Sequence, residues 1–78
     1  MDWEVRENPK RLAKVFRFKD FREALAFANR VGELAEAQGH HPRLTVEWGR
    51  VEVEWWTHSA GGITAKDEEM ARLTDALL

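Results

Sequence analysis

The stretch RLTVEWGRVEVEW, residues 43–55, decides the fold because apolar and polar residues alternate on both sides of one glycine. Such alternation is typical of two half-buried strands. Gly49-Arg50 lies between them, and glycine at the first central position favours a two-residue type II′ turn. The pattern therefore predicts a β-hairpin. Its apolar face would carry Leu44, Val46, Trp48, Val51, Val53 and Trp55.

A second hairpin is predicted upstream of this one. WEVRE at 3–7 and RLAKVFRF at 11–18 are separated by the turn-forming pair Asn8-Pro9. We expect Trp3 and Val5 to share one side of the first segment. In the second segment, one apolar face would carry Leu12, Phe16 and Phe18.

Two helices are predicted from helical spacing and capping residues. Residues 20–39 begin with Asp20 as N-cap and Glu23 in a capping-box position, and Gly39 can end the helix in a left-handed conformation. The expected apolar face comprises Phe21, Ala24, Leu25, Ala28, Val31 and Ala35. A last helix follows Thr64 as N-cap, with Asp67 at its third position. Its apolar stripe would be Met70, Leu73 and Leu77.

The predicted order is strand-strand-helix-strand-strand-helix. A sheet with one apolar face needs a covering layer, and two helices can provide it. The sequence therefore predicts an α+β two-layer sandwich, with a four-stranded antiparallel sheet and helices on one face. A chain of 78 residues has room for one core, so residues 1–78 form a single predicted domain.

Composition argues against several classes of function. Twelve Lys and Arg alternate with fourteen Asp and Glu, without the basic face of a nucleic-acid-binding protein. No apolar run has the roughly 18–20 residues that span a bilayer, and the N-terminal MDWEVRENPK does not resemble a secretion signal. Cysteine is absent, which excludes disulfides and thiolate zinc sites. We expect a cytoplasmic protein that binds neither nucleic acid nor membrane.

All three histidines lie at the two ends of the 43–55 hairpin. A turn at Gly49-Arg50 would place Trp48 opposite Val51 and, by continuation, His41 opposite His58. This pair would lie on the polar face beside Trp56. His40 has the other parity, so a hydrogen-bonded structural role competes with a functional one. Because imidazole titrates near pH 6.5, such a cluster suits proton transfer at neutral pH.

A zinc site is the competing interpretation of the histidines. Three imidazoles and Glu36 could in principle supply its ligands. However, adjacent strand residues point to opposite faces, so His40 and His41 make poor joint ligands. No pair of candidate ligands has the i, i+4 spacing on a helix either. We therefore expect no metal.

The spacing of these residues resembles that of the pterin-4a-carbinolamine dehydratase family. The matching pattern is Glu36, three residues, His40-His41-Pro42, then Trp48, nine residues, His58 and a downstream Asp67. The neighbouring FRFKDFREALAFANRV, residues 16–31, is similar to the family's strand-to-helix segment. The resemblance covers roughly residues 12–78.

The resemblance implies a function and a set of site residues. The family dehydrates 4a-hydroxytetrahydropterin to quinonoid dihydropterin, which recycles the pterin cofactor of aromatic amino acid hydroxylases. It uses no metal or organic cofactor and forms homodimers or homotetramers. The catalytic residues implied here are His40, His41 and His58. The implied substrate-binding residues are Glu36, Gly39, Pro42, Trp56, Thr57, Ser59 and Asp67.

Other roles are open for several of these residues. A carboxylate at Asp67 would cap the last helix, and Glu36 could be an ordinary solvated side chain. Trp56 could stack on a flat pterin or fill a contact between subunits. For the whole domain, the alternative is a non-catalytic dimerisation or interaction module, because animal members of the family also act as partners of a transcription factor.

Overall fold

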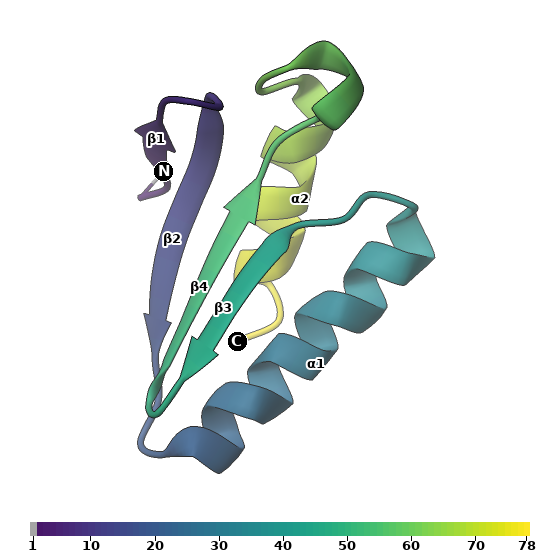
Figure 1. Cartoon of the computed structure of the whole chain (residues 1–78). Coiled ribbons are helices and arrows are strands. Elements are labelled where there is room, and N and C mark those ends of the chain that lie inside the picture. Colours follow the sequence, from purple (N-terminus) through teal and green to yellow (C-terminus); the bar gives the residue numbers. More distant parts are fainter. Residues whose placement is uncertain (1) are drawn as a thin grey trace.

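A computed structural model describes residues 2–78, which form a sheet with two helices packed against it (Figure 1). The elements are β1 (Glu4–Arg6), β2 (Arg11–Arg17), α1 (Phe21–Gln38), β3 (Arg43–Glu47), β4 (Arg50–Trp55), a 3-10 turn (His58–Ala60) and α2 (Ala65–Asp75). The sheet has four antiparallel strands in the order β1-β2-β4-β3. The predicted α+β sandwich is thus confirmed. Neither helix is long and apolar enough to cross a membrane, as judged from residues 2–78.

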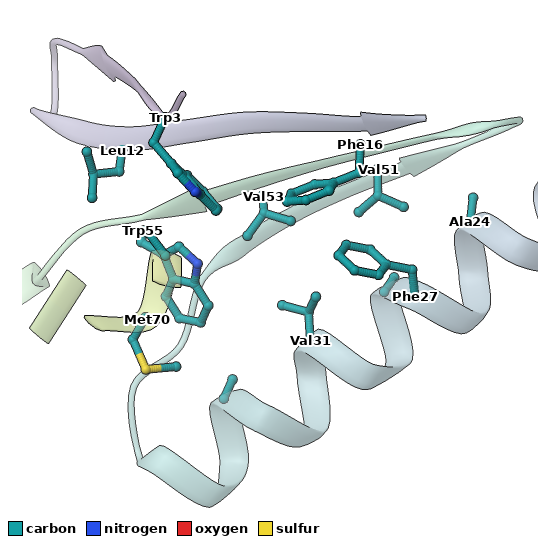
Figure 2. Packing of buried hydrophobic residues seen from close by; sticks show 13 residues of the cluster. Trp3, Leu12, Phe16, Ala24, Phe27, Val31, Val51, Val53, Trp55 and Met70 are labelled. Atoms are coloured by element: carbon teal, nitrogen blue, oxygen red, sulfur yellow. The ribbon is translucent and has the colours of Figure 1, made fainter. Parts of the chain in front are cut away.

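The core lies between the sheet and the helices and is centred on β4 (Figure 2). Val51, Val53 and Trp55 are inaccessible to solvent because α1 and α2 cover this face of the sheet. Burying each such side chain contributes about 1.5–3 kcal/mol. Trp55 also donates its indole N–H to the hydroxyl of Thr74 in α2, at 3.1 Å. The strand at the centre of the core therefore ends directly beside α2.

Helix α1 begins and ends as predicted, but its buried face is rotated. Asp20 accepts a hydrogen bond from the backbone N–H of Glu23, and Gly39 is left-handed with φ of 62°. Phe27, absent from the predicted face, is fully buried, whereas Phe21 and Leu25 are 46% and 42% exposed. The reason is that the sheet ends at β3, so this side of α1 has no further strand to cover.

In α2 the buried positions are Asp67, Met70, Ala71 and Thr74. Leu73, and Leu77 just after the helix, were predicted on its apolar face but are only partly buried. At the other end of the chain, Trp3 is buried but Val5 is 53% exposed, because β1 is the edge strand. Trp3 packs edge-on against Phe16, with ring centroids 6.0 Å apart. The apolar surface of the chain termini is therefore only partly covered.

The predicted register of the β3–β4 hairpin is wrong by two residues. Val46 pairs with Val51 and Leu44 with Val53, so the turn residues are Trp48 and Gly49. Gly49 has φ of 68°, and a Cβ there would lie only 3.0 Å from the carbonyl oxygen of Phe18. The backbone N–H of Phe18 donates to the Gly49 carbonyl at 2.8 Å, which fixes the turn against the end of β2.

A two-residue shift preserves which residues face the core, whereas a one-residue shift would reverse every side chain. The predicted apolar face therefore survives in β3 and β4. Trp48 is the exception, because it belongs to the turn and is 72% exposed.

The outer face of the sheet carries a buried charge network. Glu54, only 2% exposed, accepts hydrogen bonds from Arg43 at 2.8 and 2.9 Å and from Arg11 at 2.7 Å. Arg6 lies 3.8 Å from the same carboxylate. The hydrogen bonds from Arg43, together with those from Arg11, outweigh desolvation and lower the pKa of Glu54 to about 2. Paired charges thus cover the face that the helices leave open.

We expect Glu54→Gln to lower the free energy of unfolding by about 3 kcal/mol at pH 7, because removal of one partner leaves the arginines uncompensated. The folded-state pKa is depressed from 4.5 to about 2, so this stabilisation is complete above pH 4.5 and is lost as pH falls toward 2. Urea unfolding at several pH values measures both effects. The control is Glu47→Gln, an exposed carboxylate on β3, which should change stability by less than about 0.5 kcal/mol. Equal effects of the two substitutions would contradict the network's role.

Candidate active site

A cavity of about 420 Å³ opens where β4 ends, and it brings together all three histidines. The connection from α1 to β3 supplies one side of it, and the segment after β4 supplies the other. The lining residues are Gly39, His40, His41, Trp56, Thr57, His58 and Ser59. The three imidazoles lie close together, as predicted, but not through the predicted strand pairing. His41 and His58 are not strand partners, because β3 begins at Arg43, β4 ends at Trp55 and the register differs.

Asp67 holds two residues of the cavity wall, His40 and Thr57, by hydrogen bonds. Its side chain is fully buried at the start of α2 and accepts a hydrogen bond from His40 Nε2 at 2.6 Å. It also accepts from the Thr57 hydroxyl at 2.7 Å and from the backbone N–H of Thr64 at 2.9 Å. Asp67 therefore caps α2, as predicted, and at the same time contacts an imidazole. One carboxylate links the α1–β3 connection, the end of β4 and α2.

The hydrogen bonds keep Asp67 ionised despite its burial. Desolvation alone would raise the pKa of Asp67, but hydrogen bonds from Thr57, His40 and Thr64 outweigh it and lower the pKa below its usual value. An anionic acceptor at Nε2 requires a proton on that nitrogen. In the neutral ring, Nδ1 of His40 is then the hydrogen-bond acceptor.

Two consecutive tryptophans each hold one imidazole. Side chains alternate along a strand, so Trp55 points into the core and Trp56 points to the outer side of the sheet. The ring of His40 stacks on Trp55, with centroids 5.9 Å apart and an interplanar angle of 16°. The ring of His58 stacks on Trp56 at 4.9 Å and 9°. The cavity therefore straddles the end of the sheet, with one stacked imidazole on each side.

His41, like His40, has a carboxylate partner, but its side chain is much more exposed to solvent. Its Nε2 lies 2.5 Å from Glu36 Oε2, and the two side chains are 61% and 78% exposed. Glu36 lies in the last turn of α1 and contacts His41 without lining the cavity itself. This pair is open to solvent, whereas His40 is only 15% exposed and its partner Asp67 is fully buried.

A short loop positions His58 and Ser59. Thr57 and Gly62 form an isolated antiparallel bridge, in which the Thr57 N–H donates to the Gly62 carbonyl at 2.8 Å. Between them, residues 58–60 make the 3-10 turn, and Gly61 ends it in a left-handed conformation with φ of 67°. The two glycines thus close a loop that projects His58 at the rim of the cavity.

Most, but not all, of the predicted site residues line this cavity. Pro42, Glu36 and Asp67 do not line it, although Glu36 contacts His41 and Asp67 contacts His40. Two further residues hold the site together: Trp55, predicted only as a core residue, stacks on His40, and Thr64, predicted only as a helix cap, donates its backbone N–H to Asp67. The alternation around Trp55 contained no signal for its contact with His40. Throughout residues 2–78, no three His, Asp or Glu side chains converge as a metal site would require.

Comparison with known proteins identifies the family to which the chain belongs. The family model described as pterin 4 alpha carbinolamine dehydratase matches residues 1–77. A Chlorobium limicola protein, named provisionally as a pterin-4-alpha-carbinolamine dehydratase, is 64% identical over 97% of this chain and 69% of its own length. The chain spans 59% to 70% of the length of five such relatives.

Two solved structures are similar as well. The transcriptional coactivator/pterin dehydratase of Brucella melitensis superposes with a TM-score of 0.86 at 35% identity, over 95% of this chain and 79% of the other. A pterin dehydratase-like RuBisCO assembly factor of the alpha-carboxysome has a TM-score of 0.83 at 23% identity, over 99% and 89%, and shows likeness of fold alone. The chain therefore belongs to the pterin-4a-carbinolamine dehydratase family of hydro-lyases.

Proposed function

We propose that this protein dehydrates 4a-hydroxytetrahydropterin to quinonoid dihydropterin by histidine general acid–base catalysis. The observation that carries this proposal is the convergence of three imidazoles on one cavity, within a domain of the dehydratase family. The cellular role would be recycling of the pterin cofactor of aromatic amino acid hydroxylases in the cytoplasm. The reaction needs no metal or organic cofactor.

The chemistry requires one proton donor and one proton acceptor. The bond between C4a and its hydroxyl breaks, and the hydroxyl leaves as water after it receives a proton. A ring nitrogen loses a proton, and its electron pair forms the new carbon–nitrogen double bond. Positioned side chains typically accelerate such transfers about 10²–10⁴-fold. A protonated imidazole and a neutral one at the same cavity meet this requirement.

His41 and His58 are the proposed proton-transfer groups. Both are exposed at the cavity, so each can restore its protonation state from solvent after a turnover. A hydrogen bond from His41 Nε2 to Glu36 leaves Nδ1 of the neutral ring as a base. His40 is held by Asp67 and would contact and orient the pterin, while the remaining wall is lined by Gly39, Trp56, Thr57 and Ser59. Pro42, which follows His41, would shape the edge of the cavity.

We expect His41→Ala and His58→Ala each to lower kcat for dehydration by about 10²-fold or more, because each removes one proton-transfer group. The measurement is stopped-flow decay of enzymatically generated 4a-hydroxytetrahydropterin, with EDTA present to remove adventitious metal. Far-UV circular dichroism should be unchanged, since neither ring is part of the core.

Wild-type rates in both alanine variants would refute the assignment of these histidines. No acceleration by the wild-type protein would instead favour a non-catalytic interaction module. The Brucella melitensis relative, described as a transcriptional coactivator as well as a pterin dehydratase, makes this the second candidate.

We expect Asp67→Asn to reduce kcat about 10–100-fold, because an amide can present N–H instead of an anionic acceptor to His40. The test is ¹⁵N NMR of the His40 ring at neutral pH. The wild type should carry its proton on Nε2, and the variant should lose this preference. Glu68→Gln, the exposed neighbour in the first turn of α2, is the matched control and should leave both readouts unchanged. An unaltered His40 tautomer in Asp67→Asn would contradict the anchoring role.

We also propose that the protein forms a homodimer or homotetramer through the β3 edge. Beside this edge lies a groove of about 750 Å³, lined in part by Leu25, Ala28, Leu44 and Val46. An antiparallel copy of β3 centred on Thr45 would place Arg43 opposite Glu47 of the second copy. This arrangement pairs opposite charges and the free backbone groups of an edge strand.

Val46→Lys should shift the protein to monomer in light scattering coupled to size exclusion, because it places a charge in the apolar groove. Val5→Lys, the same substitution on the other edge strand, should leave the association state unchanged. Dissociation by Val5→Lys alone would assign the contact to β1.

A further inference from the structure

We propose that Arg43 is a positioning residue for His58, acting through the indole of Trp56. This inference rests on the proposed function, since it concerns the orientation of a proposed proton-transfer group. It assigns a role to the outer face of the sheet, which the mechanism above does not use.

The guanidinium of Arg43 is fixed although its side chain is 53% exposed. Its Nε donates to Glu54 Oε1 at 2.8 Å, and its Nη2 donates to Oε2 at 2.9 Å. This two-bond geometry is the strongest form of an arginine–carboxylate pair. Arg43 and Glu54 are also backbone partners across β3 and β4, so the pair is held by the sheet itself. Arg43 therefore has one defined position above the outer face.

The fixed guanidinium lies over Trp56. Its Cζ is 5.4 Å from the indole ring centroid, within the range of a cation–π contact. The same indole stacks on His58 with a nearly parallel ring, at 4.9 Å and 9°. Trp56 is thus in contact with Arg43, which the sheet holds in place, and with His58, a proposed proton-transfer group.

Strand periodicity explains why these side chains form a line. Glu54 and Trp56 are two residues apart at the end of β4, and residues at this spacing project to the same side. His58 follows after another two residues, where the 3-10 turn begins. The order of contacts is therefore Glu54, Arg43, Trp56 and His58, running from a buried carboxylate to the rim of the cavity.

The consequence is that His58 is oriented without a hydrogen bond to a carboxylate like those of His40 and His41. The cation–π contact and the aromatic stacking each favour one relative orientation of the groups they join. Together they define the orientation of the His58 ring in an exposed turn. Small displacements of a reacting group reduce rates strongly, so loss of Arg43 should be visible in kcat.

The test compares Arg43→Met with Arg11→Met. Both substitutions remove a hydrogen bond to Glu54, but Arg11 belongs to β2 and the structure records its hydrogen bonds to Glu54 and the β1–β2 turn. Arg43→Lys keeps a cation that can still lie over the indole. The first readout is the ¹H chemical shift of the His58 ring protons, which the stacked indole displaces upfield. The second is kcat and KM for dehydration, with thermal unfolding recorded for every variant.

Arg43→Met should move the His58 ring protons toward their unstacked shift and lower kcat about 3- to 10-fold. Arg43→Lys should retain part of both. Arg11→Met should lower the melting temperature but leave the His58 shift and kcat unchanged. If it does not fold, Arg6→Met, which touches the same network through Glu52, replaces it.

An unchanged His58 shift in Arg43→Met would overturn the inference, as would an equal change in Arg11→Met. The NMR readout does not depend on catalysis. If the wild-type protein shows no dehydratase activity, the proposed function fails, and the ring-proton shifts still decide whether Arg43 positions His58.

Discussion

The buried carboxylate of Asp67 is the group on which the candidate site depends. A buried anion is tolerated only when several donors surround it, and here the donors come from three separate segments. His40 follows α1, Thr57 follows β4, and Thr64 precedes α2. The same bonds that satisfy the charge therefore hold together the two loops that form the cavity. The carboxylate that caps α2 is thus the same group that holds His40 and Thr57 in the site.

The central strand β4 distributes the remaining parts of the site between two environments. Trp55 extends the apolar core up to His40, whereas Trp56 faces outward and holds His58. The inner side consists of buried apolar side chains, and the outer side is a network of arginines around Glu54. His40 is thereby fixed by its hydrogen bond to Asp67, and His58 by stacking on the partly buried ring of Trp56. Such a division suits a reaction with one positioned group and others that exchange protons with solvent.

Much of this arrangement could be predicted from residue patterns, and the misses have tertiary causes. Alternation in 43–55 and the capping residues at Asp20 and Gly39 predicted the sandwich correctly, because those signals are local. The hairpin register failed because the turn at Gly49 is fixed by a contact with Phe18, which no local pattern contains. The histidines were expected to meet as strand partners. They meet instead across two loops, and the error of two residues left the faces unchanged.

The proposed binding of a pterin in the histidine cavity can be measured by an NMR titration of the protein with a dihydropterin. The account predicts saturable shifts at the ring protons of His40, His41 and His58 and at the indole N–H of Trp56, with little change at Trp48 on the far turn. Shifts confined to the groove along β3, or no saturation at these four rings, would contradict it.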